Sequence, residues 1–264
     1  MKRIVSSDNA RFKALLKLAE SSRERKKHGL SLLDGTHLVA AYREHVGLPV
    51  ELVVSDSGSS NPEVRRLIDT TAPVAPLVLS DQLFQQLSTV ATPTGVLATV
   101  KTPRPPVVPA HIGACVMLED IQDPGNLGSL LRSAAAAGVE HVFLSRLSVH
   151  AWSPRVLRAG MGAHFMLQIY EQCDLHLLAR EFRGRVIATS HRAEKAVFDA
   201  DLAGEVALVF GNEGAGLSPE LTAVAHEVVA IPMPGRAESL NIAAAAAVCL
   251  FERVRQLEAR RGRQ

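Results

Sequence analysis

The stretch from Val206 to Phe251 constrains the fold of this chain more than any other. It opens with a short apolar run, Val206–Phe210, of a length typical of a buried strand. A second apolar run, Glu227–Ile231, leads through an irregular loop into an alanine-rich helix. Two strand ends thus each continue into a loop and then a helix, and open α/β sheets bind ligands at such carboxyl ends of strands. We therefore expect a cofactor there.

The loop after the first of these strands contains three glycines. Gly211, Gly214 and Gly216 follow the order G-x-x-G-x-G, so the loop is neither the G-x-G-x-x-G dinucleotide fingerprint nor a Walker A loop. Glycine permits positive φ and close approach of another molecule to bare backbone. A glycine loop alone is equally typical of a plain turn, but Glu213 lies inside this one, which favours a functional site.

Capping residues mark the helices that follow both loops. Ser218-Pro219 is typical of an N-cap followed by proline at the first helical position. Ser239 can cap the alanine-rich helix, which is predicted to run from Leu240 to about Arg255.

At 264 residues the chain is long enough for two domains. No apolar run is long enough to span a bilayer and the first residues lack an apolar signal core, which predicts a cytoplasmic protein with no membrane partner. The three cysteines lie far apart in apolar or helical surroundings, so we interpret them as small core side chains and not as disulfides, ligands or nucleophiles. They are Cys115, Cys173 and Cys249.

Positive charge is concentrated at the start of the chain. Residues 1–30 carry nine Lys and Arg against three Asp and Glu, although the net charge of the whole chain is only +2. Such a cluster is typical of a polyanion partner, and for this segment RNA is favoured over a merely solvated helix face. For the second basic group, Arg260, Arg261 and Arg263, a solvated tail is the favoured interpretation.

Strands and helices alternate up to a proline-rich stretch, Lys101–Ala110, which we interpret as a linker. The alternation predicts a small α/β domain over residues 1–104. Its expected helices are Asn9–Ala19, His37–His45, Asn61–Asp69 and Gln82–Leu87, and its expected strands are Leu30–Leu33, Val50–Val54, Val74–Leu79 and Gly95–Val100. The segment Arg23–His28 is predicted to be an exposed basic turn.

A second α/β domain is expected over residues 108–264. Its first strand, Ala114–Leu118, is followed by a D-P-G turn, and Asn126 is predicted to cap the helix Leu127–Ala137, which also carries Arg132. Further strands are expected at Val142–Leu144, Phe165–Ile169 and Val186–Thr189, with helices near Trp152–Ala163 and Leu175–Arg183.

The ten histidines are scattered. None lies at metal-ligand spacing from another histidine or a cysteine, so no metal is expected. His150, His164 and His191 lie near expected strand ends, where a structural role is favoured over contact with a ligand.

Three motifs of the second domain closely resemble the SpoU/TrmH branch of the SPOUT methyltransferases, which transfer a methyl group from S-adenosylmethionine to a ribose 2′-hydroxyl in RNA. The first reads DPGNLGSLLRSAAAAGV, the second LVFGNEGAGLS and the third IPMPGRAESLNIAAAAAVCLFE. They occur in this order across roughly residues 108–256, so the match is specific. The first domain, including LLDGTHLVAAY, is similar to the small ribosomal-protein-like RNA-binding domain that many members carry.

The resemblance implies a fold, a cofactor and an assembly. The second domain would contain a deep trefoil knot over about residues 206–256, a rare exception to the avoidance of knots, and the knot would hold S-adenosylmethionine. Backbone near Gly211, Ile231 and Leu240 would bind this cofactor, and Thr189 and Met233 are expected close to the same pocket. A homodimer is implied as well, in which the alanine-rich helix packs on its mate and Arg132 reaches the partner's cofactor.

The same resemblance assigns the catalytic residues. Arg132 is assigned to the phosphate and the 2′-oxygen; because an arginine stays protonated in proteins, we expect it to stabilise the developing oxyanion and not to act as a simple base. The methyl donor is already activated, so in-line placement accounts for most of the catalysis. Asn126, Glu213, Ser239 and Asn241 are expected to orient Arg132, the ribose and the loops.

Two functions from different classes remain open at this point. The first is an enzyme that methylates ribosomal RNA, with transfer RNA as a variant substrate. The second is a catalytically silent RNA-binding or ribosome-assembly factor on the same fold. Because all five residues assigned to catalysis are present, the sequence favours the enzyme.

Overall fold

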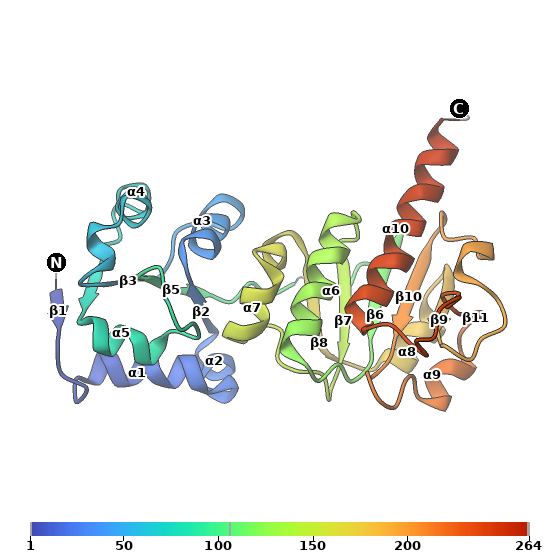
Figure 1. The fold of residues 1–264 in the computed structure, drawn as a ribbon, viewed down its shortest axis with the longest axis horizontal. Helices are drawn as coiled ribbons and strands as arrows, with labels where there is room; N and C mark the ends of the chain where they lie inside the picture. Colours follow the sequence, from blue (N-terminus) through green and yellow to red (C-terminus); the bar gives the residue numbers. More distant parts are fainter. Residues whose placement is uncertain (1, 106, 263–264) are drawn as a thin grey trace. The chain divides into compact units, whose positions relative to one another are not determined.

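The computed structural model describes residues 2–105 and 107–262, and the chain forms two compact units. The first unit contains the chain up to Pro103 together with Trp152–Phe165, and the second contains Arg104–Ala151 and the chain from Met166 onwards. Each unit is built around its own sheet (Figure 1). In the described part of the chain, no helix is both long and apolar enough to cross a membrane.

The first unit is a five-stranded mixed sheet with helices on both faces. Its strands lie in the order β1-β4-β3-β5-β2, and β5 is antiparallel to both of its neighbours. The strands are β1 Lys2–Ile4, β2 Leu30–Asp34, β3 Glu51–Ser55, β4 Leu77–Leu79 and β5 Val96–Lys101. The helices are α1 Ala10–Glu20, α2 Ser22–His28, α3 Thr36–His45, α4 Pro62–Thr70, α5 Asp81–Leu87 and, from the later segment, α7 Pro154–Gly160.

Two pairs of helices enclose this sheet, with α1 and α5 on one side and α3 and α4 on the other (Figure 1). Phe12 and Leu15 of α1 are buried one helical turn apart, and they pack with Leu83 and Phe84 of α5 over the inward side chains of the strands. Asn9, expected as the first residue of this helix, is its N-cap, because its side chain accepts hydrogen bonds from two backbone amides.

The predicted basic turn over Arg23–His28 is wrong, because this segment forms helix α2. Ser21 caps its start, and Gly29 ends it in a left-handed conformation. Arg25 is buried, and its guanidinium donates hydrogen bonds to two backbone carbonyl oxygens at the end of α1. The density of charge therefore does not indicate an exposed turn here. One of the basic side chains, Arg25, instead donates to carbonyl oxygens at the end of the preceding helix.

The second unit contains a six-stranded parallel sheet in the order β11-β9-β10-β6-β7-β8. Its strands are β6 Ala114–Leu118, β7 His141–Ser145, β8 Gln168–Cys173, β9 Arg185–Thr189, β10 Val206–Phe210 and β11 Glu227–Val229. Its helices are α6 Pro124–Ala136, α8 Leu175–Glu181, α9 Pro219–Ala223 and α10 Ile242–Arg261. All five residues of β10 are buried, as the unbroken apolar run predicts for a central parallel strand.

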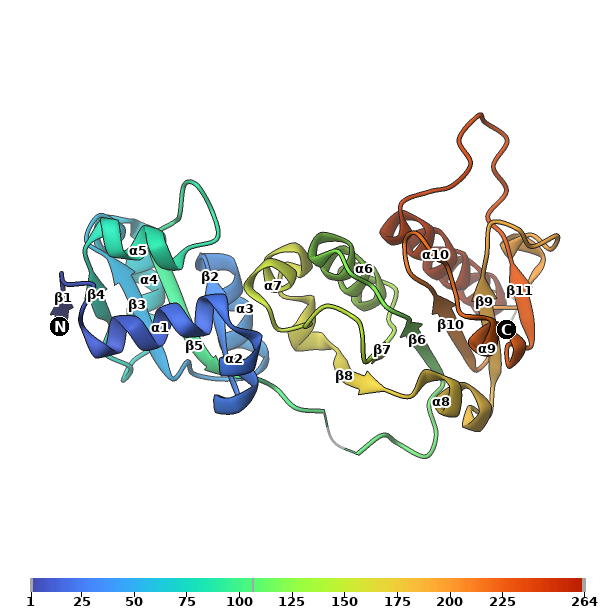
Figure 2. The same ribbon diagram turned by 90° about the horizontal axis from the view of Figure 1, so that it is seen from below.

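Helices cover both faces of this sheet, as the two ribbon views show (Figures 1 and 2). Cys115 and Met117 of β6 point into a core shared with α8 and α9. Because side chains alternate along a strand, Val116 and Leu118 point to the other face, where α6 and α10 pack against each other. The predicted α/β fold is confirmed.

Two strands of the sequence analysis are displaced in the structure. Strand β4 is shorter than the predicted Val74–Leu79, because Pro76 has no amide hydrogen to give to the ladder. The strand predicted at Phe165–Ile169 begins later, as β8, because Ala163–Met166 forms a 3₁₀ turn. Strand β1 has no counterpart in the sequence analysis and pairs in parallel with β4.

Strands β6 and β10 lie side by side at the point where the order of the sheet changes direction. Strands β7 and β8 lie beyond β6, whereas β9 and β11 lie beyond β10. The last residues of the two strands, Leu118 and Phe210, are paired in register. The loops that follow them therefore leave the sheet next to each other, at the position where open α/β sheets bind ligands.

The three thiols are free, as predicted. Burial raises the pKa of Cys115 and of Cys249 to about 12, and that of Cys173 to about 11. Because the thiolate is the reactive form, we expect all three to react slowly with Ellman's reagent near neutral pH in the native protein. Unfolding in guanidinium chloride should release three fast thiols. A thiol that reacts within seconds in the native chain would contradict this expectation.

Candidate active site

Three side chains from separate segments form a chain of hydrogen bonds at the carboxyl edge of the second sheet. The Nδ2 of Asn126 donates to Oε1 of Glu213 at 3.0 Å, and the Nδ2 of Asn241 donates to Oδ1 of Asn126 at 2.8 Å. The paired residues lie 87 and 115 positions apart in the sequence. They follow β6, β10 and β11, so the order of the parallel strands brings them together.

Asn126 reaches this cluster because it does not cap α6. The predicted cap is wrong: Asp123 is the N-cap, and its Oδ1 accepts a hydrogen bond from the Asn126 backbone amide at 2.7 Å. Helix α6 begins one turn earlier than predicted, with Pro124 at its start, a position that suits proline. The side chain of Asn126 is thereby left for its two partners.

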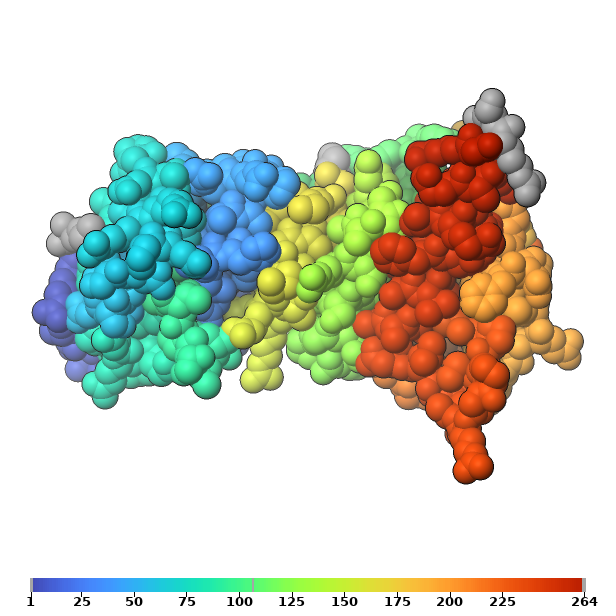
Figure 3. All heavy atoms as spheres, turned by 45° about the horizontal axis from the view of Figure 1, so that its top comes forward, coloured from blue at the N-terminus to red at the C-terminus, as the bar shows by residue number. Residues whose placement is uncertain are grey.

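The predicted cap of the last helix is also wrong, by two residues. Asn241, and not Ser239, caps α10, and its Oδ1 accepts from the Ala243 amide at 2.9 Å. Since Asn241 also bonds to Asn126, the start of α10 is tied to the cluster. Ser239 is exposed, with no side-chain hydrogen bond to the described residues, in the loop between β11 and α10. This loop extends well away from the sheet of its own unit (Figures 2 and 3).

The glycines after β10 give their loop its own shape. Asn212 and Gly216 exchange two backbone hydrogen bonds of 3.0 and 2.9 Å, and Gly216 has a φ of +74°. A Cβ on Gly211 would lie 2.3 Å from the carbonyl carbon of Gly216, so no side chain fits there. The closed loop holds Glu213 at its tip.

Two residues that the sequence analysis missed join the loop after β10 to the loop after β6. Glu119 accepts hydrogen bonds from the backbone amide and the hydroxyl of Ser218, both at 2.7 Å. Asn212 donates to the carbonyl oxygen of Asp120 at 2.8 Å. Glu119 directly follows β6, and Asn212 is the second residue after β10. A polar residue at the carboxyl end of a buried strand is the sequence signal that could have identified both.

The chain after β11 offers an edge of open backbone. No backbone amide of residues 231–240 donates to another residue in the described part of the chain. Ile231 and Met233 are half-buried, and Leu240 is 40% exposed. Thr189, at the end of neighbouring β9, donates its hydroxyl to a carbonyl oxygen of β10 at 3.0 Å. An adenosine can form hydrogen bonds with open backbone groups while its base packs on apolar side chains, so this edge fits S-adenosylmethionine.

Arg132 is not bonded to the Asn126–Glu213–Asn241 cluster. It is exposed on α6 and forms no hydrogen bond or ion pair with any residue that the structure describes. All of its guanidinium donors are therefore available to an anionic group that is not part of this chain's own fold.

Family models match both parts of the chain. The SpoU rRNA Methylase family matches residues 113–251, and the MRM3-like substrate binding domain matches residues 9–98. The first range contains every residue of the candidate site. The second lies within the first unit.

Known relatives resemble the chain over nearly its whole length. It is 35% identical to an uncharacterized tRNA/rRNA methyltransferase of Synechocystis, over 96% of this chain and 93% of the relative. It is 30% identical to the 23S rRNA (guanosine(2553)-2′-O)-methyltransferase RlmP of Bacillus subtilis, over 95% of this chain and 98% of the relative.

A solved structure also matches the chain over nearly its whole length. An AdoMet-bound rRNA methyltransferase from Sinorhizobium meliloti matches with a TM-score of 0.84 and 27% identity, over 97% of this chain and 98% of that one. The resemblance inferred from the three motifs is therefore confirmed. The chain belongs to the SpoU rRNA methylase family, with an N-terminal substrate-binding domain and a C-terminal SpoU domain.

Proposed function

We propose that this protein transfers the methyl group of S-adenosylmethionine to a ribose 2′-hydroxyl of ribosomal RNA. The observation that carries the proposal is the hydrogen-bonded cluster of Asn126, Glu213 and Asn241 beside the open backbone of residues 231–240. A silent RNA-binding factor has no need of either feature. Ribosomal RNA is favoured over transfer RNA because a relative named for 23S rRNA resembles the chain over both of its domains.

The cofactor would lie at the carboxyl ends of β9, β10 and β11. Backbone near Gly211, Ile231 and Leu240 would hold it, with Thr189 and Met233 alongside. S-adenosylmethionine supplies a methyl group that its sulfonium has already activated. The chain would form a trefoil knot over about residues 206–256. The boundary between the two domains would lie at residues 104–108.

The side chains would position the ribose and stabilise charge. Arg132 would bind the phosphate and the 2′-oxygen, since a fixed positive charge stabilises an oxyanion as the proton leaves. Asn126 and Asn241 would orient Glu213, which uses one carboxylate oxygen for Asn126 and keeps the rest of its exposed side chain available to the substrate. Ser239, on the extended loop, would close over the site from outside.

The protein would act as a homodimer in the cytoplasm. Helix α10 buries Ala246, Cys249 and Leu250 within its own unit. On another face, exposed Ala244 and Phe251 recur at helical spacing, and Phe251 is 48% exposed. Figure 3 shows α10 open to solvent along its length. A second copy of the chain would cover this apolar stripe and bring the partner's Arg132 to the cofactor.

Two measurements test the proposed function. Calorimetry is expected to detect binding of S-adenosylmethionine to the purified chain, which separates an enzyme from a silent factor. Mapping of 2′-O-methylation in cellular RNA, with and without the gene for this chain, is expected to show one ribosomal RNA position that loses its methyl group. A chain that binds no cofactor, or a loss confined to transfer RNA, would contradict the proposal.

A further inference from the structure

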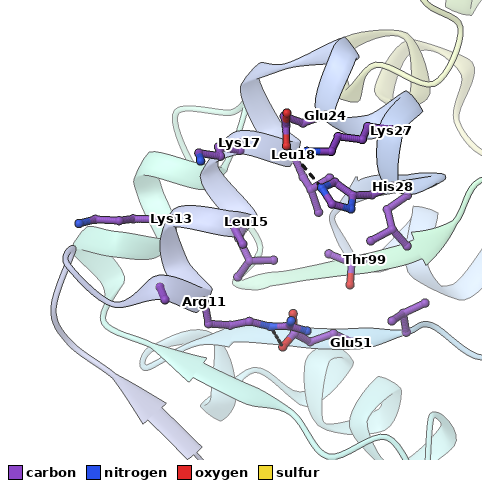
Figure 4. Close-up of a pocket in the computed structure, with 14 residues that line it drawn as sticks. Arg11, Lys13, Leu15, Lys17, Leu18, Glu24, Lys27, His28, Glu51 and Thr99 are labelled. Atoms are coloured by element: carbon purple, nitrogen blue, oxygen red, sulfur yellow. Dashed lines mark hydrogen bonds and ion pairs between the residues drawn. The ribbon is translucent and has the colours of Figure 1, made fainter.

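The first unit contains a cavity of about 620 Å³ between α1, α2 and the strands beneath them. Its walls are mainly apolar, with Ala14 and Leu18 from α1 and Leu30 and Val50 from the strand side. The volume lies within the range of about 300–1,000 Å³ that is typical of small-molecule sites. Figure 4 shows the cavity with its charged groups around the apolar centre.

The charged groups around this cavity are mostly basic. Arg11, Lys13, Lys17 and Lys27 line it, against Glu24 and Glu51. Lys13 is bound to an aspartate outside the cavity at 2.9 Å and points away from its centre (Figure 4). Lys17 and Lys27 form no hydrogen bond or ion pair with residues in the described ranges, and Lys27 extends from α2 toward α1 (Figure 4). Two ammonium groups are thus available at the rim to bind an anion.

Glu51 gives the cavity a specific acceptor. Its Oε1 accepts from Nε of Arg11 at 2.9 Å, whereas its Oε2 is buried without a hydrogen-bond partner among the described residues. The Glu51 side chain is only 14% exposed. A buried carboxylate oxygen without a donor is costly, so a ligand that offers an N–H group would be stabilised at this point.

We propose that this cavity receives one unpaired nucleotide of the RNA substrate. The base enters the apolar space between Leu18 and Val50, its edge donates to Oε2 of Glu51, and its flanking phosphates contact Lys17 and Lys27. An unpaired nucleotide is required because side chains cannot reach base edges in the deep groove of an RNA duplex. The proposal rests on the proposed function in so far as that function makes RNA the substrate.

The acceptor also sets a preference among bases. Guanine offers two adjacent donors, N1–H and the N2 amino group, to a carboxylate. Uracil offers a single N–H between two carbonyl oxygens, which the carboxylate repels. Guanosine is therefore the preferred occupant and uridine the poorest.

The test uses the full chain and two fluorescent RNA pentanucleotides, one all uridine and one with a central guanosine. Ala14→Trp fills the cavity from an exposed helix position without a change of charge. Its matched control is Ala91→Trp, at an exposed alanine of the same unit that does not line the cavity. By fluorescence anisotropy, the Ala14→Trp chain should bind the guanosine probe at least about tenfold more weakly than the control.

Adjacent lysines separate the cavity from general charge. Lys27 lines it and Lys26 does not, although both are exposed on α2. Lys27→Gln is expected to weaken binding and to lower the slope of log affinity against log salt by about 0.7, the value for one phosphate of a single strand. Lys26→Gln should change both quantities less. Glu51→Gln should narrow the preference for guanosine over uridine, because the amide keeps an acceptor but loses the charge.

Several outcomes would overturn the proposal. The first is that the wild-type chain binds neither pentanucleotide. The second is that Ala14→Trp binds both probes as the control does, and if light scattering then shows an altered oligomeric state, the cavity is an interface between copies of the chain. Calorimetry with S-adenosylmethionine on the same samples tests the proposed function separately, because the cavity variants lie outside the cofactor edge. Guanosine-selective binding without cofactor binding would refute the methyl transfer and support the nucleotide site.

Discussion

Replacement of Arg132 by alanine is expected to lower methyl transfer by at least about a hundredfold, the usual scale for the loss of one group that stabilises developing negative charge. Folding and the affinity for S-adenosylmethionine should stay at wild-type values. The reason is that Arg132 is exposed and bonded to no described residue, so its removal leaves no buried group without a partner. Its contribution is made only when the RNA is present.

Two variants sharpen this experiment. Arg180→Ala removes an equally exposed arginine from α8, which packs on the opposite face of the sheet, and should retain wild-type transfer. Arg132→Lys keeps the charge without the planar fork and is expected to recover part of the rate. Single-turnover transfer and calorimetry on the same samples distinguish chemistry from binding. If Arg132→Ala abolishes cofactor binding while the residual complex transfers normally, the assigned role is wrong.

A heterodimer of two inactive chains is expected to recover activity if the active sites are shared. One chain carries Arg132→Ala. The other carries Gly211→Ala, whose new Cβ would collide with the backbone of Gly216 and so distort the proposed cofactor loop. In the heterodimer, one of the two sites combines an intact cofactor loop with the partner's intact Arg132. The isolated heterodimer should therefore recover about half of wild-type activity, and an unseparated random mixture, of which half is heterodimer, about a quarter.

The design of the measurement decides between shared and separate sites. The chains carry different tags and are expressed together, because folded subunits exchange slowly, and the heterodimer is isolated before the assay. Circular dichroism of each chain is the control that it is folded. A folded heterodimer without activity would mean that Arg132 serves the cofactor of its own subunit, and a monomer in light scattering would remove the dimer altogether.

Local sequence signals determined most of the elements in this chain. Strands β6 and β10 begin and end at the residues predicted, because a short apolar run bounded by turn signals has the length of a buried strand and is too short for a typical helix. Ser218 caps α9 as predicted, with Pro219 at the first helical position. The three motifs sufficed to identify the family, since chemistry at one site requires particular residue types at fixed spacing.

Where two polar residues compete for one helix start, the sequence did not decide between them. Asp123 and Asn126 are both good caps, as are Ser239 and Asn241, and intrinsic preference ranks them too closely to choose. In each case, the structure decides by the rest of the fold. The side chain of Asn126 forms hydrogen bonds with Glu213 and Asn241. The side chain of Asn241 forms hydrogen bonds with both the first turn of α10 and Asn126.

Only the tertiary structure decided which distant residues meet. Local sequence patterns do not predict the order of the strands in the sheet. The pairing of β6 with β10 places Asn126 beside Glu213. Likewise, the segment Trp152–Phe165 lies within the first unit although it follows the first strand and helix of the second, and a Met161 carbonyl is bonded to His37 at 3.1 Å. The physical reason is that helix and strand preferences act over a few residues, whereas pairing and packing are chosen by the free energy of burying the whole sheet.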